Sequence, residues 1–525
     1  MKHLYYKFFV IFVCLIVLFG CDGKNFTPNG NSGKPEPEEE NPIPVLTSIS
    51  PSSCVSRMPA FELEVVGSDF VAGSTISFRG KEMETTFVDD KHLRCVIPPD
   101  DTMLSAAAQS DIALVKVGNP SPGGGDSNSM DFTICDNYTF SGLKEIDWND
   151  KRSEHLRLVC VEPGGKISVL YQKYDQREFL GYYNLIYLRQ SNDGGESWGE
   201  SLQVTKHLLN APNKPLFKVD HNGVMHCGHW REGGRVYYHQ SRDNGLHWDK
   251  PVVLPPSTDL PLSCCGTKFH MDVDPAGVVH VLIQDTEWED YTGNVVHDRS
   301  DDGGVHWWTT NLSRRFCGAD PFIVCDGEER VYAAWRDRKE KRAHTEWFIG
   351  FRRSIDGGQT WEDQQIVSNE SQFNYNMDIR IAVNPVNHHV YLLYLYKNDP
   401  FIDRYRIFFR KSTDNGVNWS PHRALTKAGT NSVQEKISVD AAGNINVFFI
   451  QAGYVCNRRS TDDGATWTEQ TVLPDSQPER VSSYDIGGDE SGNMVVLIMS
   501  ENIQFQNDIW EQTAYFYRSV PCAGN

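Results

Sequence analysis

The sequence has 525 residues, with 50 Lys and Arg against 70 Asp and Glu, so its formal net charge at pH 7 is -20. This acidic balance, with no basic run to offset it, argues against nucleic acid as a partner. The chain from about residue 44 onward is long enough for two or three domains.

The chain begins with the pattern of a secretory signal. Lys2 and Lys7 provide a charged start, and the apolar run over residues 8–19 is too short to span a bilayer comfortably. The Leu-Phe-Gly-Cys sequence that ends this region resembles the processing box of bacterial lipoproteins, in which Cys21 becomes the acylated first residue. Cleavage by an ordinary signal peptidase nearby is the alternative. We expect residues 1–20 to be removed, and the protein to be exported, anchored to the outer membrane through lipid alone and exposed on the surface.

Residues 21–43 are expected to form a flexible linker, because they are rich in Gly, Pro, Asn and Glu and hold almost no apolar side chains. No later segment is long and apolar enough to cross a membrane. Of the 13 Cys, Cys14 lies in the signal and Cys21 is the proposed anchor, which leaves an odd number and so at least one unpaired thiol.

The sequence predicts neither a metal nor a cofactor. It has no CxxC pair of the kind that holds structural zinc. The segment HCGH has metal-binding residue types, but the side chains of His226 and His229 would face opposite sides of a strand.

Residues 44–135 alternate apolar and polar side chains over short runs broken by turn residues, as in FELEVVGSDF, STISFRG and DIALVKVGNPSPGGG. Short strands at such close spacing indicate an all-β sandwich. The segments PVLTSISPSS, VVGSDFVAGSTISFRG, CVIPPD and VGNPSPGGGDSNSMDFTI resemble the IPT/TIG family of immunoglobulin-like domains. That resemblance implies a spacer or docking module, and we expect no catalysis in it.

Residues 136–525 contain an octapeptide, Ser-x-Asp-x-Gly-x-x-Trp, six times at intervals of 48 to 59 residues. Its aspartates are Asp193, Asp243, Asp302, Asp356, Asp414 and Asp462. Each interval holds four short strand-like runs, and four antiparallel strands in about 50 residues correspond to one blade of a β-propeller. A seventh unit near the C-terminus lacks the octapeptide and a fourth strand, which residues 137–143 could supply by closing the ring. The sequence therefore predicts seven blades, with six as the alternative.

The octapeptide fits the hairpin between the third and fourth strands of each blade. Its Asp can accept hydrogen bonds from the N–H groups of the turn, its Gly adopts a positive φ at little cost, and its Trp can bury its ring between strands. Six copies around a ring cannot converge on one substrate, so we interpret them as structural. The pattern resembles the Asp-box (BNR) repeat of the sialidase superfamily. That resemblance implies an all-β protein with an immunoglobulin-like β-sandwich followed by a sialidase-like β-propeller.

The face opposite the octapeptides is expected to consist of the starts of the innermost strands and the loops after the second strands. Alternate positions on the inner strands gather cations and carboxylates near the axis of an acidic protein. The candidate catalytic residues are His229, His270, Asp378 and Tyr174, and the candidate binding residues are Arg380, Arg336, Lys268, Lys436, Trp230 and Arg231. Arg binds carboxylates through paired hydrogen bonds and aromatic rings stack on sugars, so these residues favour an acidic sugar. The alternative is a set of ion pairs that only stiffens the loops.

The resemblance to sialidases also implies catalytic residues that this sequence does not have in register. In that family an Arg begins the first inner strand, an Asp precedes the first Asp box, and a Tyr nucleophile has a Glu partner. Here His155 stands near the Arg position and Phe179 near the Asp position. Tyr484 is one residue out of step, and Glu501 lies beyond the expected Glu position. The sequence therefore argues against the usual sialidase chemistry.

We expect a surface lipoprotein that binds and cleaves an acidic glycan containing sialic or uronic acid. A glycosidase would use Asp378 with Asp272 or Asp320, or a Tyr–Glu pair, to protonate the leaving oxygen. A polysaccharide lyase would use His or Tyr as base and acid while Arg or Lys neutralises the carboxylate. The alternatives are a non-catalytic protein that passes glycans to other glycan-utilisation proteins, and an adhesin that binds proteins.

Overall fold

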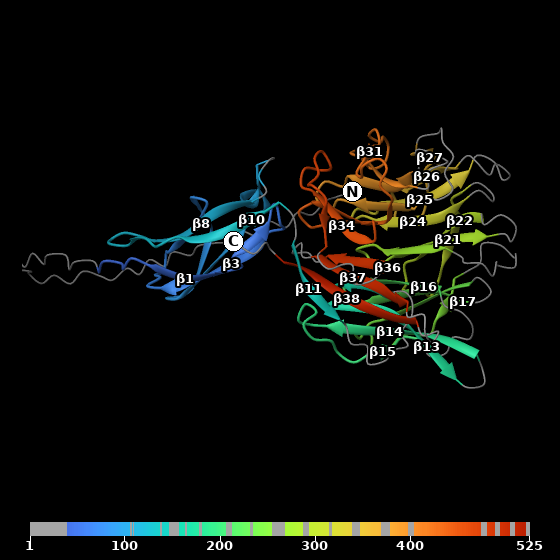
Figure 1. Ribbon diagram of the computed structural model, residues 1–525, viewed down its shortest axis with the longest axis horizontal. Helices are drawn as coiled ribbons and strands as arrows, with labels where there is room; N and C mark the ends of the chain where they lie inside the picture. Colours follow the sequence, from blue (N-terminus) through green and yellow to red (C-terminus); the bar gives the residue numbers. More distant parts are fainter. Residues whose placement is uncertain are drawn as a thin grey trace, which may run out of the picture.

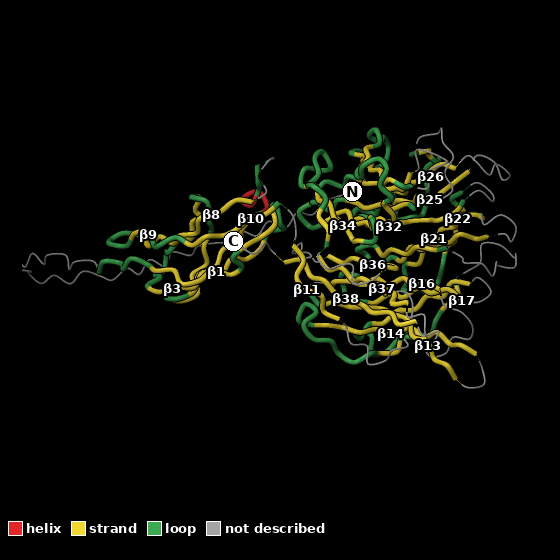
Figure 2. Tube along the Cα trace, in the orientation of Figure 1, coloured by secondary structure: helices red, strands yellow, loops and turns green. Residues whose placement is uncertain are grey.

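The computed structural model of the chain consists of a small body and a larger body, both rich in strands (Figure 1). Strands predominate in both bodies (Figure 2), and the helix found in the described residues is a short 3-10 turn at Pro99–Thr102. That turn falls far short of a membrane span, and no other described residue belongs to a candidate span. The structure describes residues 39–105, 108, 110–136, 139–145, 157–162, 165–177, 181–205, 213–231, 235–254, 268–286, 293–313, 318–338, 347–368, 378–396, 404–473, 480–488, 494–503 and 510–520.

The small body is a sandwich of two sheets, as the sequence predicted. One sheet has the order β1 (Val45–Ser50), β3 (Phe61–Ser68), β7 (His92–Ile97) and β6 (Thr85–Asp89). The other has the order β2 (Ser53–Val55), β10 (Met130–Cys135), β8 (Ser110–Asn119), β4 (Thr75–Phe78) and β5 (Lys81–Glu82), with β9 (Gly125–Asp126) paired to β8. Alternation along the strands turns Leu63, Val65, Phe78 and Phe132 into the core, where each is fully buried.

The described part of the larger body contains seven four-stranded antiparallel sheets. Six follow in chain order: β12 (Arg157–Val161), β13 (Ile167–Arg177), β14 (Gly181–Ser191) and β15 (Leu202–Gln203); β16 (Asn213–Val219), β17 (Met225–Arg231), β18 (Arg235–Ser241) and β19 (Val252–Val253); β20 (Phe269–Val273), β21 (Val279–Thr286), β22 (Gly293–Ser300) and β23 (Trp308–Asn311); β24 (Ala319–Cys325), β25 (Val331–Arg338), β26 (Trp347–Ser354) and β27 (Gln365–Ile366); β28 (Ile379–Val383), β29 (Val390–Tyr396), β30 (Arg406–Ser412) and β31 (Arg423–Ala424); β32 (Ser432–Val439), β33 (Ile445–Gln451), β34 (Tyr454–Ser460) and β35 (Thr471–Val472). The last has the order β36 (Arg480–Gly488), β37 (Met494–Ile503), β38 (Trp510–Val520) and β11 (Thr139–Glu145).

The sheets close into a ring around an axis lined by their first strands. The first strand of each sheet contacts the first strand of the next sheet, and β36 contacts β12. The strand β11, which follows the sandwich, pairs with the C-terminal strand β38 so that Thr139 lies opposite Val520. The two ends of the propeller are therefore joined within one sheet, and the ring needs no exposed edge there.

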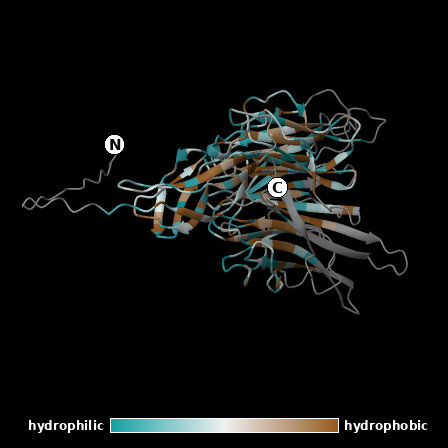
Figure 3. Cartoon of the chain, turned by 60° about the vertical axis from the view of Figure 1, so that its left-hand side comes forward, coloured by the Kyte–Doolittle hydropathy of each residue, from teal (hydrophilic) through white to brown (hydrophobic). Residues whose placement is uncertain are grey.

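The second strands β29 and β33 are almost wholly apolar because both of their faces are covered by neighbouring sheets. In β29, Leu392 and Tyr394 pack toward the sheet on one side, whereas Tyr391 and Leu393 pack toward the sheet on the other side. Figure 3 shows the resulting hydrophobic strands with hydrophilic turns around them. This two-sided burial holds the ring together and leaves the first strands to line the axis.

The Asp boxes form a network of local hydrogen bonds at the hairpins between third and fourth strands. Ser412 Oγ donates to Asp414 Oδ1 at 2.8 Å, the N–H of Asn418 donates to the same oxygen at 2.8 Å, and the N–H of Gly416 donates to Ser412 Oγ at 2.7 Å. The same three bonds recur in the other five boxes. These bonds support a structural role for the octapeptide.

Each box also joins its sheet to a neighbouring one. Gly416 has φ +85, and a Cβ there would lie 2.7 Å from the Phe351 ring of the preceding sheet. Trp419 meets the same ring edge-on at a centroid distance of 5.1 Å. The Gly and the Trp of the box therefore serve the contact between two sheets, because only Gly lets the turn approach so closely.

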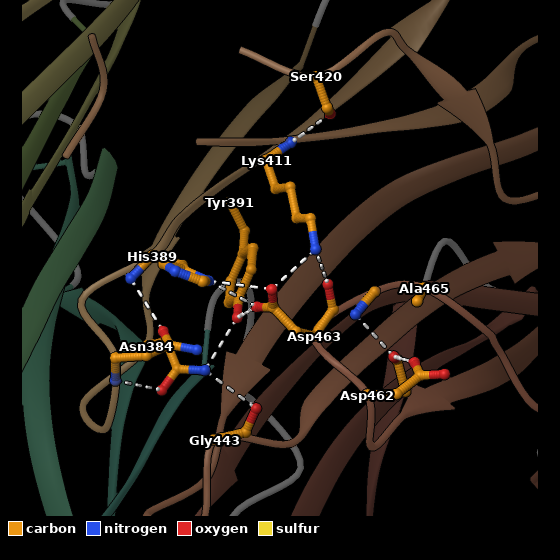
Figure 4. A network of polar contacts seen from close by, with 12 residues as sticks. Asn384, His389, Tyr391, Lys411, Ser420, Gly443, Asp462, Asp463 and Ala465 are labelled. Atoms are coloured by element: carbon orange, nitrogen blue, oxygen red, sulfur yellow. Dashed lines mark hydrogen bonds and ion pairs between the residues drawn. The ribbon is translucent and has the colours of Figure 1, made fainter. Parts of the chain in front are cut away.

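In the sixth Asp box, Asp463 adds a polar contact between two sheets (Figure 4). Asp463, next to Asp462, accepts hydrogen bonds from Tyr391 Oη at 2.5 Å and Lys411 Nζ at 2.7 Å, and pairs with His389 Nδ1 at 2.9 Å. Burial alone would raise the pKa of Asp463, but these hydrogen bonds hold that pKa below its ordinary value.

The sandwich docks on the Asp-box side of the propeller. Arg459, fully buried, donates from Nη1 to the backbone oxygen of Ser56 at 2.5 Å, and its Nη2 lies 3.7 Å from Asp440 Oδ2. Val55 of the sandwich packs in the same buried cluster as Phe448 of β33. The ends of β13 and β21, and with them the opposite face of the ring, point away from the sandwich in Figure 1.

Candidate functional site

The axis of the ring is lined by the inward-facing side chains of the first strands. These strands end at the turns near the Asp-box face, so their first residues border the axis on the face that points away from the sandwich. Ligands of propellers and other ring-shaped folds are commonly held at such concave ends. The charged residues that the sequence placed near the axis can therefore be followed one strand at a time.

Nearest the Asp-box face, ion pairs tie the first strands together. Lys218 Nζ lies 3.0 Å from Asp272 Oδ1, while Asp272 Oδ2 accepts a backbone N–H of β24 at 2.9 Å. Lys436 Nζ lies 2.8 Å from Asp485 Oδ1, while Asp485 Oδ2 accepts a backbone N–H of β12 at 2.9 Å. The charge of Asp272 raises the pKa of Lys218, so the ammonium group of Lys218 stays protonated at neutral pH. These two pairs match the alternative of structural ion pairs.

A third acid, Asp320, forms ion pairs with two of the predicted binding residues. Lys268 Nζ is ion-paired with Asp320, and Arg336 Nη2 lies 2.9 Å from the second carboxylate oxygen. Asp320 has φ +51 and lies in an irregular part of β24, between Ala319 and Phe322, where the pairing register with β25 shifts. The guanidinium of Arg336 stacks 4.3 Å above the ring of Trp347. Lys268 and Arg336 therefore meet, but a carboxylate of the chain already neutralises part of their charge.

A stacked pair of rings occupies the next position around the axis. The His270 ring lies 3.7 Å from the Phe322 ring at an interplanar angle of 28°, and the Arg380 guanidinium lies 5.5 Å from that same Phe322 ring. Burial, with the charges of Lys218 and Arg380, holds the pKa of His270 well below its usual value, so the imidazole is neutral at pH 7. The N–H of Ile323 approaches His270 Nδ1 at 3.4 Å, which favours the tautomer with its proton on Nε2.

Arg380 differs from the other axial cations. Its Nη1 donates to the backbone oxygen of Ile379 at 2.7 Å, and it forms no ion pair with any residue that the structure describes. Its side chain is partly exposed. A guanidinium in this state retains donors for a carboxylate supplied by a ligand.

Glu435 lies beside Arg380 as a carboxylic acid. The strand β32 has a register shift between Val433 and Lys436, with Gln434 at φ +55, and this irregularity turns Glu435 into a fully buried position. Burial raises the pKa of Glu435 to about 8, Arg380 opposes the increase, and the negative charge of Asp378 adds to it. The carboxyl group is therefore protonated at neutral pH, and neither of its oxygens has a hydrogen-bond partner among the described residues.

Tyr484 closes this group on the side of the last sheet. Its hydroxyl donates to the backbone oxygen of Gln434 at 2.5 Å, and Lys436 Nζ lies 5.8 Å from the centroid of its ring. Burial and the charge of Glu435 raise the pKa of Tyr484 well above its usual value, so the phenol stays protonated. We refer to His270, Phe322, Asp378, Arg380 and Glu435 as the axial cluster.

The structure brings some of the predicted residues together. His270, Asp378 and Arg380 all belong to the axial cluster, and the charges of Arg380 and Lys436 both act on His270 and on Glu435. The side chains of Tyr174 and Arg231 lie outside the described residues. The predicted residues that the structure places near the axis therefore belong to the first strands or directly precede them.

Two residues that the sequence placed in a loop on the open face lie within a strand instead, which corrects the sequence interpretation. His229 and Trp230 are 1% and 4% exposed, and His229 stacks on Tyr237 at 5.5 Å within the sheet region between blades. Both belong to β17 rather than to the loop after it, and their burial keeps their side chains off the open face. Asp272 and Asp320, offered as glycosidase carboxylates, are already engaged by Lys218 and Lys268.

Two residues of the axial cluster were not identified from the sequence. Strict alternation along β32 selected Gln434, and only the irregularity at that point brings Glu435 inward instead. Phe322 lies four residues before the turn aspartate Asp326, at the same offset as His270 from Asp274. The same spacing from the turn therefore places both His270 and Phe322 at the axis.

The comparisons with known proteins agree with this architecture. The BNR repeat-like domain family matches residues 216–394 and 343–504, and the IPT/TIG domain family matches residues 44–134. Among curated proteins, none matches the chain by sequence.

Solved structures with a similar course of the chain share little sequence with it. A polysaccharide lyase of family PL25, an ulvan lyase, has 11% identity and a TM-score of 0.47, covering 72% of this chain and 98% of its own. An α-L-arabinanase from Penicillium chrysogenum has 13% identity and a TM-score of 0.41, covering 72% and 98%. The NanB sialidase from Streptococcus pneumoniae has 12% identity and a TM-score of 0.37, covering 87% and 83%.

Proposed function

Because this chain belongs to the BNR repeat-like domain family, we propose that its axial cluster binds a glycan with carboxylate groups and hydrolyses it. The observation that carries the proposal is the combination of an unpaired guanidinium, a carboxylate and a protonated carboxylic acid on adjacent first strands. Sialic and uronic acids are the sugar classes with the required carboxylate.

The choice of an acidic ligand follows from the charges around the axis. Asp272, Asp320 and Asp485 are each matched by a cation of the chain, whereas Arg380 has no acidic partner in the described residues. Glu435 does not offset that charge, because its pKa of about 8 keeps it neutral at pH 7. A ligand carboxylate would supply the missing negative charge and accept two parallel hydrogen bonds from the guanidinium.

Hydrolysis follows from the two different carboxyl groups. A glycosidase needs one protonated carboxylic acid for the leaving oxygen and one carboxylate to stabilise the oxocarbenium-like transition state, and their pKa values must be pushed apart. Glu435 would serve as the acid and Asp378 as the carboxylate. The Glu435 carboxyl is covered in the ligand-free chain, so it must rotate toward the axis when the glycan binds.

A lyase is the second candidate, because the neutral His270 and the guanidinium of Arg380 both lie against the side-chain ring of Phe322. Arg380 would neutralise the uronate carboxylate while the imidazole removes the adjacent proton. The Ile323 N–H that approaches Nδ1 favours a proton on Nε2, which suits a hydrogen-bond donor better than a base. This tautomer is the reason for preferring hydrolysis.

The test is to incubate the purified protein with sialylated and with uronate-containing glycans and to compare it with Arg380→Ala. Hydrolysis releases a reducing sugar without new ultraviolet absorbance, whereas elimination produces an unsaturated, ultraviolet-absorbing sugar. We expect the substitution to reduce activity by at least about a hundredfold, because a charge-assisted bidentate contact contributes about 3 kcal/mol. Arg242→Ala is the matched control, since Arg242 pairs with Asp249 at an exposed position near an Asp box.

Equal activity of the protein and Arg380→Ala would remove the axial cluster from the reaction. Retention on a glycan column without any product would replace hydrolysis by the non-catalytic glycan-binding function. Absence of both product and retention would overturn the glycan proposal and leave the protein-binding adhesin.

We also propose, from the N-terminal sequence, that the protein is exported and lipid-anchored at Cys21, on the surface of the outer membrane and beside other glycan-utilisation proteins. We expect a radiolabelled fatty acid to be incorporated into the protein in growing cells, and this label to be absent from Cys21→Ala. Protease treatment of intact cells would degrade a surface-exposed protein and spare one that faces inward.

A further inference from the structure

Three metal-binding side chains converge between the first two sheets of the propeller, away from the axial cluster. Cys227 and His229 are two residues apart on β17 and therefore point to the same side of the strand. His239 lies on β18 directly opposite Cys227 in the strand pairing. One ligand atom from each of the three residues lies within 4.8 Å of the other two.

This group is enclosed in an apolar environment. Cys227, His229 and His239 are 0%, 1% and 2% exposed. Cys227 belongs to a buried cluster with Leu170, Ile186, Leu188, Val204, Phe217 and Met225, which spans the first two sheets. Counted from the residue that pairs with the Asp-box Ser, the positions of Cys227 and His229 hold Val447 and Phe449 in β33, both fully buried. A thiol and an imidazole at these two positions are therefore more polar than the packing between sheets requires.

We propose that Cys227, His229 and His239 bind a Zn²⁺-type divalent cation. Zinc prefers sulfur and nitrogen donors in tetrahedral geometry, so one thiolate and two imidazoles would supply three of its four ligands, and a water molecule would be the fourth. Binding would deprotonate the Cys227 thiol, release that proton to solvent and form the metal–sulfur bond, with no change in oxidation state. Small movements of the side chains bring atoms now within 4.8 Å to the spacing of a tetrahedral site.

The surroundings of the three ligands support a rigid, structural site. The Tyr237 ring stacks on His229 at 5.5 Å, and the Asp-box residue Trp248 lies 5.1 Å from the His239 ring. These rings restrict the orientation of both imidazoles, which is what a preorganised site requires. Because the ligands come from two strands in the core between two sheets, the cation would fasten β17 to β18 and stabilise the contact with the first sheet.

The sequence argued against a metal in the HCGH segment because His226 and His229 face opposite sides of the strand. The structure places His226 on the other side, where its Nδ1 contacts Tyr238 Oη at 2.7 Å. The third ligand comes instead from the neighbouring strand, as His239. A pairing partner 12 residues beyond Cys227 cannot be recognised from a local motif.

His226 supplies a matched control for the experiment. It is a buried His on the same strand, next to Cys227 but on the opposite face. We would measure the metal content of the full chain by mass spectrometry of the elements, for the protein itself and for Cys227→Ser, His239→Gln and His226→Gln. The chelator-treated proteins would then be loaded with Co²⁺, a spectroscopic substitute for Zn²⁺.

We expect about one Zn²⁺ per chain for the protein and for His226→Gln, and at least about a tenfold lower content for Cys227→Ser and His239→Gln. The Co²⁺ form should show a thiolate-to-metal charge-transfer band in the near ultraviolet that Cys227→Ser lacks. If the substituted chains fail to fold, the band of the unsubstituted protein decides the matter by itself.

The proposal is overturned if the folded protein neither contains nor takes up Zn²⁺, or if its Co²⁺ form lacks the charge-transfer band. Equal metal loss in His226→Gln and Cys227→Ser would also overturn it, because the loss would then not depend on the proposed ligands. The measurements do not involve the axial cluster, so the proposed glycan hydrolysis can fail or hold independently.

Discussion

Replacing Glu435 by Gln should make the free energy of unfolding fall less as the pH rises. The folded-state pKa of about 8 lies above the ordinary value of 4.5. A carboxyl group whose pKa is raised by folding contributes stability that is present below the unfolded pKa and is lost as the pH rises through the folded pKa. Gln has nearly the same shape and never ionises, so Glu435→Gln removes this loss.

The magnitude follows from the difference between about 8 and 4.5. This pKa difference of about 3.5, at about 1.4 kcal/mol for a tenfold change in the ionisation equilibrium, corresponds to up to about 5 kcal/mol. The free energy of unfolding can be measured with urea and Trp fluorescence for the variant and the parent. The variant's value minus the parent's value should be larger at about pH 9 than at about pH 5, by up to this amount. Other titrating groups are common to both proteins and cancel in the comparison.

The control is Asp485→Asn, which removes an axial carboxylate that pairs with Lys436. The negative charge that pairs with Lys436 is lost at both pH values, so this substitution should lower the free energy of unfolding by a similar amount at each. If the difference between Glu435→Gln and the parent is the same at both pH values, Glu435 is not held neutral by the fold, and the acid role proposed for it fails with it.

The remaining predictions concern the packing of the ring. Gly416→Ala should destabilise the protein by about 2 kcal/mol, because φ is +85 and the new Cβ would meet the Phe351 ring at 2.7 Å; an unchanged melting temperature would contradict the role of the box glycine. Arg459→Ala leaves Asp440 buried without its cation and should cost about 3 kcal/mol, together with faster proteolysis between sandwich and propeller; equal cleavage rates would show that the two bodies are held elsewhere. Burial raises the pKa of Asp298 to about 7, so Asp298→Asn should gain stability over the parent between about pH 4 and about pH 8, and a constant difference across that range would refute it.

The fold was accessible from the sequence because its signals are local. The bonds of an Asp box join residues at most four positions apart, such as Asp414 and Asn418, so the motif carries its own structure wherever it occurs. The apolar run of β29 likewise shows that both faces of a second strand are covered. The repeat of these features at a near-constant interval then predicts a ring of blades and the strand that closes it.

The site was only partly accessible, and each difference has a structural cause. Counting alternate residues found His270, Asp378 and Arg380, because a regular strand preserves its period of two up to those positions. The count failed at Glu435, because the pairing register of β32 shifts between Val433 and Lys436 and no local motif predicts this shift. The sequence also assigned His229 to a loop after a second strand, whereas His229 lies within β17 and is buried.

What the sequence by itself determined is the set of features that neighbouring residues produce together: the Asp boxes, the strand periods, the number of repeated units and the acidic charge. What only the tertiary structure decided is which distant groups meet, as Glu435 meets Arg380 and Asp378, and Cys227 meets His239. The physical reason is that a pKa or a ligand set depends on burial and on separations of a few ångströms between different strands. Those separations are set by register, strand irregularities and ring closure, which no short segment specifies.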